Sequence, residues 1–388
     1  MATTTNDENG QFSKGSAPYP RVVSLLPSIT ELVASLDAAE HIVGITHECD
    51  YPPAVMDRKP QVVTSSDISP YSMTQEEIHE AVCGSLKKGH SLYGLNADVL
   101  KQAQPDIIFT QQLCDVCAVS YPVVLETCAS LVGGPGGKGN QDADSPSSSI
   151  SFNPKIISME PSNLADVFTT VRVAGNAMGP AFLERAETQV TKWQSDLDRI
   201  QETVQQLAPD SHPRVAFLEW HAPIFCGGHW IADMMKVAGA QYDMCASGAR
   251  SVAWKDQDLS TLDPDYILIG PCGFSLQQSV ADTRRLLYGE EEKNSNTCND
   301  GNDDEEDTEK KQKQEQRTIW WKSLRAVKNG NVFCLDGNSY YARPGPRLIQ
   351  GAGIIAACIH GPEVAQALGE KLAPSKGYQK MGTLHVQE

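Results

Sequence analysis

Cysteine and histidine residues recur in short segments that follow expected strands, and their side chains could bind a metal ion. They are His47, Cys49, Cys114, Cys117, His221, Cys226, His229 and Cys272. Thiolates and imidazoles are ligands of zinc and softer metals, usually four at a time. The spacing Cys114-x-x-Cys117 is that of half a zinc or redox site. The alternative is that these cysteines are core residues, because free cysteine is among the most buried residue types. If the site does bind a metal, we expect a zinc or iron ion held directly by His47, Cys49, Cys114, Cys117 and Cys272.

Aromatic and arginine residues in the same segments predict a different kind of site. The aromatic residues are Tyr51, Trp220, Trp230, Phe274, Tyr340 and Tyr341. Their flat apolar faces would form a wall for a large planar ligand with polar edges. Arg343 and Arg347 would supply fixed cations for an anionic substituent of that ligand. The alternative is that Tyr340 and Tyr341 only cover the end of a sheet.

Acid–base catalysis has weaker support in the sequence. The candidate groups are Glu31, Glu48, Asp50 and Glu219. No paired nucleophile or cofactor motif accompanies them, and a Walker loop, GxSxG and HExxH are all missing. We therefore predict a protein that is not an enzyme and has no catalytic residues. The alternative is a metalloenzyme in which Glu48 or Glu219 acts as a base beside the metal.

The elements that would position these residues alternate along the chain in two series. Expected strands cover residues 21–26, 42–46, 107–110 and 155–159, and then residues 215–219, 266–269 and 332–335. Strands that alternate with helices are typical of parallel sheets with helices on both faces. We predict two α/β lobes with parallel sheets. Ligands of such sheets bind beyond the carboxyl ends of the strands, which places a cleft between the lobes. The loops lining it would be residues 47–53, 111–117, 220–230, 271–274 and 336–347.

One long helix, at residues 182–207, separates the two series. Apolar residues at alternating steps of three and four form a single stripe along it, over about 40 Å at 1.5 Å per residue. The stripe consists of Leu183, Ala186, Val190, Trp193, Leu197, Ile200, Val204 and Leu207. The same spacing suits a dimeric coiled coil, but complementary flanking charges are lacking. We favour a helix that lies along the body and joins its two lobes.

Composition and charge limit the choice of partners and location. The net charge is −17, and residues 290–316 hold eleven acidic residues against four lysines. This charge argues against nucleic acid as a partner, because binding to phosphates needs a basic surface. The odd number of cysteines, eleven, and their scattered spacing are not those of a disulfide-bonded framework. No secretory signal and no apolar run long enough for a membrane span is visible, so we expect a cytoplasmic protein.

The chain divides into lobes, linking helices and inserts. We expect a disordered N-terminus at 1–20, an N-terminal lobe at 21–162, linking helices at 163–207 and a C-terminal lobe at 208–388. Residues 133–153 are rich in Gly, Ser and Asp and predict a flexible insert. Residues 290–316 have few apolar side chains and predict an acidic, disordered insert.

Several motifs resemble a known family. They are Leu25-Leu26-Pro27-Ser28-Ile29-Thr30-Glu31-Leu32, Val43-Gly44, Cys49-Asp50-Tyr51-Pro52, Ala103-Gln104-Pro105-Asp106-Ile107-Ile108, Phe217-Leu218-Glu219-Trp220, Gly227-Gly228-His229-Trp230, Val252-Ala253-Trp254, Pro264-Asp265-Tyr266-Ile267, and residues 338–349. In this order, on both sides of a long helix, they resemble the class III substrate-binding proteins of bacterial cobalamin and iron-siderophore ABC importers, most closely the cobalamin-binding branch.

The resemblance implies two Rossmann-like lobes, a stiff linking helix and a corrinoid or other metal-containing ligand, such as cobalamin, in the cleft. By position, the ligand wall would include Asp50, Tyr51, Trp220, Tyr340, Tyr341 and Arg343. Importer proteins are exported, and the absence of a visible export signal argues against a membrane transporter as partner. The prediction is a binding protein for such a ligand, with the thiol and imidazole metal site as the alternative.

Overall fold

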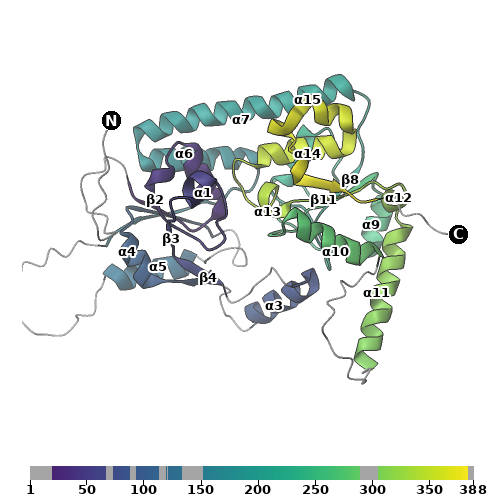
Figure 1. The fold of residues 1–388 in the computed structure, drawn as a ribbon, viewed down its shortest axis with the longest axis horizontal. Helices are drawn as coiled ribbons and strands as arrows, with labels where there is room; N and C mark the ends of the chain where they lie inside the picture. The colour runs from purple at the N-terminus through teal and green to yellow at the C-terminus, as the bar shows by residue number, and fades with distance from the viewer. Residues whose placement is uncertain are drawn as a thin grey trace, which may run out of the picture.

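The computed structural model describes residues 20–66, 73–87, 93–112, 119, 121–132, 152–288 and 305–382. Two α/β lobes lie next to each other, and the long helix α7 (Pro180–Leu207) runs along both (Figure 1). This arrangement confirms the predicted fold class. The N-terminus expected to be disordered, apart from residue 20, and most of the insert expected at 133–153 lie outside the described residues.

The first lobe contains a five-stranded sheet in the order β3-β2-β1-β6-β7, and every pairing in it is parallel. Its strands are β1 (Val22–Ser24), β2 (Ile42–Ile45), β3 (Gln61–Val62), β6 (Ile107–Thr110) and β7 (Lys155–Ser158). Successive side chains of a strand point to opposite faces. Val22 accordingly packs with helix α1 (Pro27–Ser35), whereas Val23 packs with α4 (Ala97–Ala103).

The remaining elements of this lobe lie outside the five-stranded sheet. They are η1 (Ala39–His41), α2 (Pro53–Met56), β4 (Thr64–Ser66), α3 (Gln75–Lys87), β5 (Tyr93–Leu95) and α5 (Tyr121–Val132). Strands β4 and β5 form a separate antiparallel pair, and α3 lies in the stretch of chain between them. This pair is attached to the lobe through Val63, whose N–H donates to the Ile45 carbonyl and whose carbonyl accepts from Asn96.

The second lobe contains a five-stranded sheet in the order β12-β11-β10-β8-β9. Its strands are β8 (Val215–His221), β9 (Ile224–Cys226), β10 (Tyr266–Ile269), β11 (Val332–Leu335) and β12 (Tyr378–Lys380). The three central strands are parallel, as expected, but both edge strands are antiparallel. Strand β9 follows β8 after only Ala222 and Pro223, and a link of two residues can join only antiparallel neighbours.

Helices cover the second sheet and complete the lobe. They are α8 (Ile231–Val237), α9 (Asp256–Leu262), α10 (Leu276–Tyr288), α11 (Glu305–Ser323), α12 (Arg325–Lys328), α13 (Gly337–Tyr340), α14 (Leu348–His360), α15 (Pro362–Leu372) and the short η3 (Ser375–Gly377). Helix α11 corrects the expectation of disorder over 290–316 for its residues from Glu305 onward. The stretch is rich in Glu, Lys and Gln, which are strong helix formers, and Trp321 in the last turn of the helix is fully buried.

Helix α7 follows α6 (Leu164–Met178) and packs against α6, α14 and α15. Six residues of the predicted stripe, from Ala186 to Val204, are buried there, whereas Leu207 is 46% exposed. The coiled-coil alternative is therefore wrong, because the chain itself covers the stripe. The two helices approach closely at Gly175, where a Cβ would lie 2.7 Å from the Phe182 carbonyl oxygen.

One continuous cluster of buried apolar side chains passes through both lobes and α7. It includes Ile29 and Phe109 of the first lobe, Trp193 of α7, and Phe217 and Ile355 of the second lobe. We call it the shared core. The lobes are thus joined by packing as well as by the chain.

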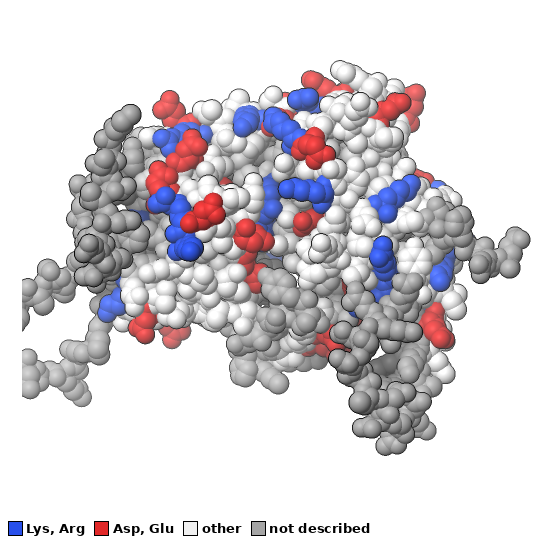
Figure 2. All heavy atoms as spheres, viewed as in Figure 1, with Lys and Arg blue, Asp and Glu red and all other residues white. Residues whose placement is uncertain are grey.

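The surface in the same orientation carries acidic and basic side chains interspersed with each other (Figure 2). The acidic side chains drawn in colour do not gather into one patch on this face. Among the described residues, no helix combines the length and apolar character that crossing a membrane requires.

Candidate functional site

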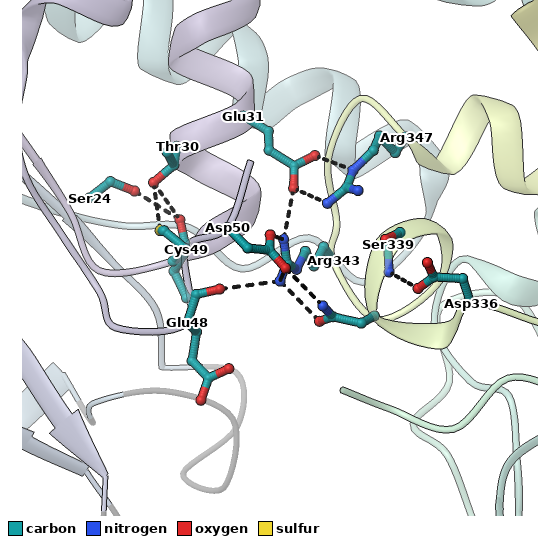
Figure 3. Close-up of polar contacts among 12 residues, drawn as sticks. Ser24, Thr30, Glu31, Glu48, Cys49, Asp50, Asp336, Ser339, Arg343 and Arg347 are labelled. Atoms are coloured by element: carbon teal, nitrogen blue, oxygen red, sulfur yellow. Dashed lines mark hydrogen bonds and ion pairs between the residues drawn. The ribbon is translucent and has the colours of Figure 1, made fainter. Parts of the chain in front are cut away.

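Two arginines of the second lobe reach two carboxylates of the first lobe (Figure 3). The Nη1 and Nη2 atoms of Arg343 donate to both oxygens of Asp50 at 2.5 and 3.1 Å, and Nη1 also reaches Glu31 at 3.2 Å. Arg347 donates to both oxygens of Glu31, at 2.8 and 2.6 Å. We call these four residues the inter-lobe ion cluster. Its two positive and two negative charges balance.

Local folding explains why these four side chains meet. Glu31 lies on α1, directly after β1, and Asp50 lies in the loop after β2. Arg343 and Arg347 lie between α13 and α14, beyond the end of β11. The carboxyl ends of strands in the two lobes therefore face each other, as predicted, and the loops that follow them carry the cluster.

Most of the ion cluster is buried. The side chains of Glu31 and Arg343 are 1% and 6% exposed, whereas that of Asp50 is 55% exposed. Buried charges are tolerated when they are paired and hydrogen-bonded. Burial acts to raise the pKa of Asp50, but hydrogen bonds and the charge of Arg343 outweigh it and the pKa is lowered. Burial likewise opposes the charge of Arg343, and its partner Asp50 more than compensates, which raises the guanidinium pKa.

The arginines were expected to meet an anionic substituent of a ligand. In the structure both guanidinium groups are occupied by carboxylates. A ligand carboxylate would therefore have to compete with Asp50 or Glu31 for them.

The six predicted aromatic residues divide into exposed and buried ones. Tyr51 is 41% exposed, with Arg347 stacked 4.5 Å above its ring centre, and Trp220 is partly exposed. The other four, which were expected to line the cleft, are at most 6% exposed: Trp230, Phe274, Tyr340 and Tyr341. Trp230 donates to the Tyr341 carbonyl at 2.8 Å. For Tyr340 and Tyr341 the structure agrees with the alternative that they pack at the end of the sheet.

The predicted metal ligands are not brought together in the described part of the chain. Cys49 is 7% exposed, its sulfur lies 3.1 Å from Thr30 Oγ1, and burial raises its pKa to about 11. His47 contacts Thr64 Oγ1 at 2.7 Å and Glu48 Oε1 at 3.1 Å. Cys272 is exposed. Cys114 and Cys117 lie outside the described residues, and within those residues no group of three or more His, Cys, Asp or Glu could hold a metal.

The remaining histidines, cysteines and acids of the site segments have partners of their own. Burial raises the pKa of Cys226, which lies inside the second lobe, to about 12. His229 stacks on Trp230 with ring centres 5.4 Å apart. Glu219 accepts a short hydrogen bond from Ser251. These residues form parts of the scaffold around the end of β8.

A second contact between the lobes was not predicted from the sequence. The Gln75 side chain on α3 accepts from the His221 N–H at 2.8 Å and donates to Asp282 Oδ2 at 2.7 Å. His221 Nε2 lies 2.6 Å from the same Asp282 oxygen. Burial acts to raise the pKa of Asp282, and His221 with other partners lowers it overall. No spacing in the sequence relates Gln75 to Asp282, which are 207 residues apart.

Two surface cavities lie away from this inter-lobe face. One, of about 330 Å³, is lined by Arg284, Tyr288 and residues 379–382. The other, of about 350 Å³, lies beside the C-terminal end of α7 and includes His212 and Lys236. Neither is lined by a predicted site residue.

Comparison with known proteins decides the family. Residues 138–338, more than half of the chain, match the family model described as periplasmic binding protein. The chain belongs to the periplasmic binding protein family. This confirms the resemblance seen in the sequence motifs. No curated protein matches the chain.

Solved structures of periplasmic binding proteins share the fold. A periplasmic heme binding protein from Pseudomonas aeruginosa is 15% identical, with 88% of this chain and 93% of that chain covered and a TM-score of 0.56. The periplasmic vitamin B12 binding protein BtuF of Vibrio cholerae is 14% identical, with 88% and 97% covered and a TM-score of 0.52. An ABC transporter substrate-binding protein from Listeria monocytogenes is 16% identical, with 88% and 98% covered and a TM-score of 0.55. At these identities the likeness establishes the fold alone.

Family membership corrects one expectation from the sequence. The chain was expected to be cytoplasmic, but its family and the structures from Pseudomonas and Vibrio are periplasmic. The expectation rested on the absence of a visible export signal. It was wrong because the match to a periplasmic family is the stronger evidence on location.

Proposed function

We propose that this periplasmic binding protein holds a metal-containing planar ligand between its lobes and catalyses no reaction on it. The observation that carries the proposal is membership in a family of binding proteins with this two-lobed fold. Relatives that bind vitamin B12 and heme support the ligand class. A relative named as an ABC transporter substrate-binding protein supports delivery to a membrane transporter, which the sequence had argued against.

Tyr51 and Trp220 supply the proposed ligand contacts. They lie on opposite lobes, after β2 and at the end of β8. Tyr51 is 41% exposed and contacts Arg347 of the ion cluster, and Trp220 is partly exposed. Flat aromatic faces suit the face of a macrocycle, with a gain beyond the burial of area.

The ion cluster helps to rank the ligands. Heme carries two carboxylates, whereas the amide side chains of a corrinoid are neutral. Because Arg343 and Arg347 are already neutralised by Asp50 and Glu31, they offer little attraction to a carboxylate. We therefore place a corrinoid such as cobalamin ahead of heme.

A titration tests this proposal. The full chain is titrated separately with cyanocobalamin and with hemin, and binding is followed by the visible spectrum and by equilibrium dialysis. We expect one cyanocobalamin per chain and weaker binding of hemin. If neither ligand binds at concentrations far above those of the protein, the proposal is wrong. If hemin binds more tightly, the ranking is wrong.

Aromatic variants test the proposed wall. Trp220→Ala and Tyr51→Ala should each weaken binding about tenfold, equivalent to about 1.4 kcal/mol, because each removes one ring face. The matched controls are Trp320→Ala on α11 and Tyr121→Ala on α5, which should bind as the unmodified chain does. Unchanged affinity in both Trp220→Ala and Tyr51→Ala would show that the ligand lies elsewhere.

The same protein preparations also test the alternative function, a metal site made of thiolates and imidazoles. Elemental analysis of the unmodified chain would then find zinc or iron near one per chain without a corrin absorbance. Replacing both Cys114 and Cys117 by serine would remove that metal. Under the proposal, the serine variant binds cyanocobalamin normally.

A further inference from the structure

Helix α3 belongs to the first lobe by its connections but lies against the second lobe (Figure 1). It leaves the first lobe after β4 and returns to it at β5, and these strands pair with each other. Its first residue, Gln75, is 1% exposed and bonded to His221 and Asp282 of the second lobe. The helix therefore bridges the two lobes.

The Gln75 side chain fits the groups that receive it. One end of the amide accepts the N–H of His221, and the other end donates to Asp282, as their polarity requires. The Asp282 side chain is 9% exposed and is also approached by Arg285 at 3.3 Å. Loss of Gln75 would leave a buried N–H without its acceptor and a buried carboxylate with one donor fewer, which is unfavourable.

Two more features hold Gln75 in place. Thr74 and Glu77 bond each other's backbone N–H groups, at 2.7 and 3.3 Å, and this capping box fixes the start of α3. Glu76 pairs with Arg317 of α11 at 3.1 Å, and Arg317 also donates a short bond to the His221 carbonyl. Both backbone polar groups of His221 are thus bound by residues from other elements.

The position of the bridge affects how a ligand would reach the face between the lobes. His221 ends β8, so the bridge lies at the carboxyl ends of the strands, where the proposed ligand contact Trp220 also lies. Helix α7 joins the lobes along one side, and α3 lies on the side away from α7 (Figure 1). A ligand that moves in or out on the side of α3 would meet this helix.

We propose that α3 is an intramolecular clasp, and that release of Gln75 from His221 and Asp282 opens the inter-lobe face to the ligand. The clasp needs no partner and no metal. The role of the clasp in ligand exchange rests on the proposed function, whereas the contact that it makes between the two lobes does not.

Hydrogen exchange tests the clasp without a ligand. The full chain, its Gln75→Ala variant and the matched control Glu80→Gln, on an exposed position of the same helix, are compared by mass spectrometry. Peptides covering α3 and His221 should exchange at least tenfold faster in Gln75→Ala, while Glu80→Gln and peptides from α7 remain unchanged. Equal exchange in Gln75→Ala and the unmodified chain would overturn the clasp. If Gln75→Ala fails to fold, Arg317→Met tests the same bridge from the second lobe.

Ligand kinetics test the role in access. With cyanocobalamin and hemin as probes in stopped flow, Gln75→Ala should raise the association and dissociation rates together, by about tenfold each, with little change in affinity. Unchanged rates for a probe that binds would overturn the gating role. If neither probe binds the unmodified chain, the proposed function fails, and hydrogen exchange alone decides the clasp.

Discussion

Glu31 and Arg343 contact each other across the lobes, although the sequence presents them as candidates for catalysis and ligand binding. The sequence does not distinguish an arginine that binds an anionic ligand from one that pairs with a carboxylate of the same chain, because the residue type is the same in both cases. The pairing partner makes the difference, and Glu31 and Arg343 are 312 residues apart. The residue types at the site could therefore be predicted, but not their pairing.

Replacing Glu31 tests whether the ion cluster holds the lobes together. Glu31→Gln keeps the shape but removes the charge that faces both arginines. Loss of one partner from a buried ion cluster costs about 3–5 kcal/mol of unfolding free energy, and we expect the lower end because Asp50 still pairs Arg343. Urea unfolding at neutral pH measures the change.

The control for this measurement is Glu184→Gln, at an exposed position of α7, which should change stability by less than about 0.5 kcal/mol. A Glu31→Gln protein as stable as this control would mean that the cluster contributes little to holding the lobes.

The lowered pKa of Asp50 predicts how its ion pair depends on pH. A carboxyl whose folded pKa lies below its unfolded value, about 3.9, stabilises the fold at higher pH. That contribution is lost as the pH falls through the folded pKa. The difference in unfolding free energy between the unmodified chain and Asp50→Asn should therefore be larger at pH 7 than at pH 3. A difference that is the same at both pH values would argue against the ion pair as its cause.

At the scale of elements, the strongest patterns were the best predicted. The stripe on α7 and the buried strands β6 and β10 follow from apolar periodicity and from short apolar runs between turns. Helix α10 was not predicted, because part of what it buries is polar, namely Ser279, Asp282 and Thr283, and apolar periodicity does not mark such a face. Helix α11 shows the opposite error, since low apolar content indicated disorder while the helix is anchored at its end by Trp321.

Contacts between elements were the least predictable. The spacing Thr74-x-x-Glu77 can be read from the sequence as a capping box, and α3 begins directly after Thr74. Nothing in the sequence of α3 indicates that it leaves its own lobe. Its bonds to His221 and Asp282 depend on where two separate lobes come to lie, and periodicity carries no information on that.

At the scale of the whole molecule, the shared core predicts cooperative unfolding. Residues of both lobes and α7 lie in one cluster, so neither lobe can lose its packing without exposing part of the other. We expect a single transition in thermal or urea unfolding, with far-ultraviolet circular dichroism and tryptophan fluorescence giving the same midpoint. Two separated transitions would show that each lobe is stable alone.

The shared core also has a consequence for synthesis on the ribosome. The first lobe leaves the ribosome well before α14 is made, because α14 begins at Leu348. Until then, apolar side chains of α7 that will pack on α14 and α15 remain uncovered, and exposed apolar surface makes nascent chains prone to aggregation. A chain that stops after α7 would carry the same uncovered surface permanently, so the nascent first lobe is the stage at which a chaperone would be most useful to this protein.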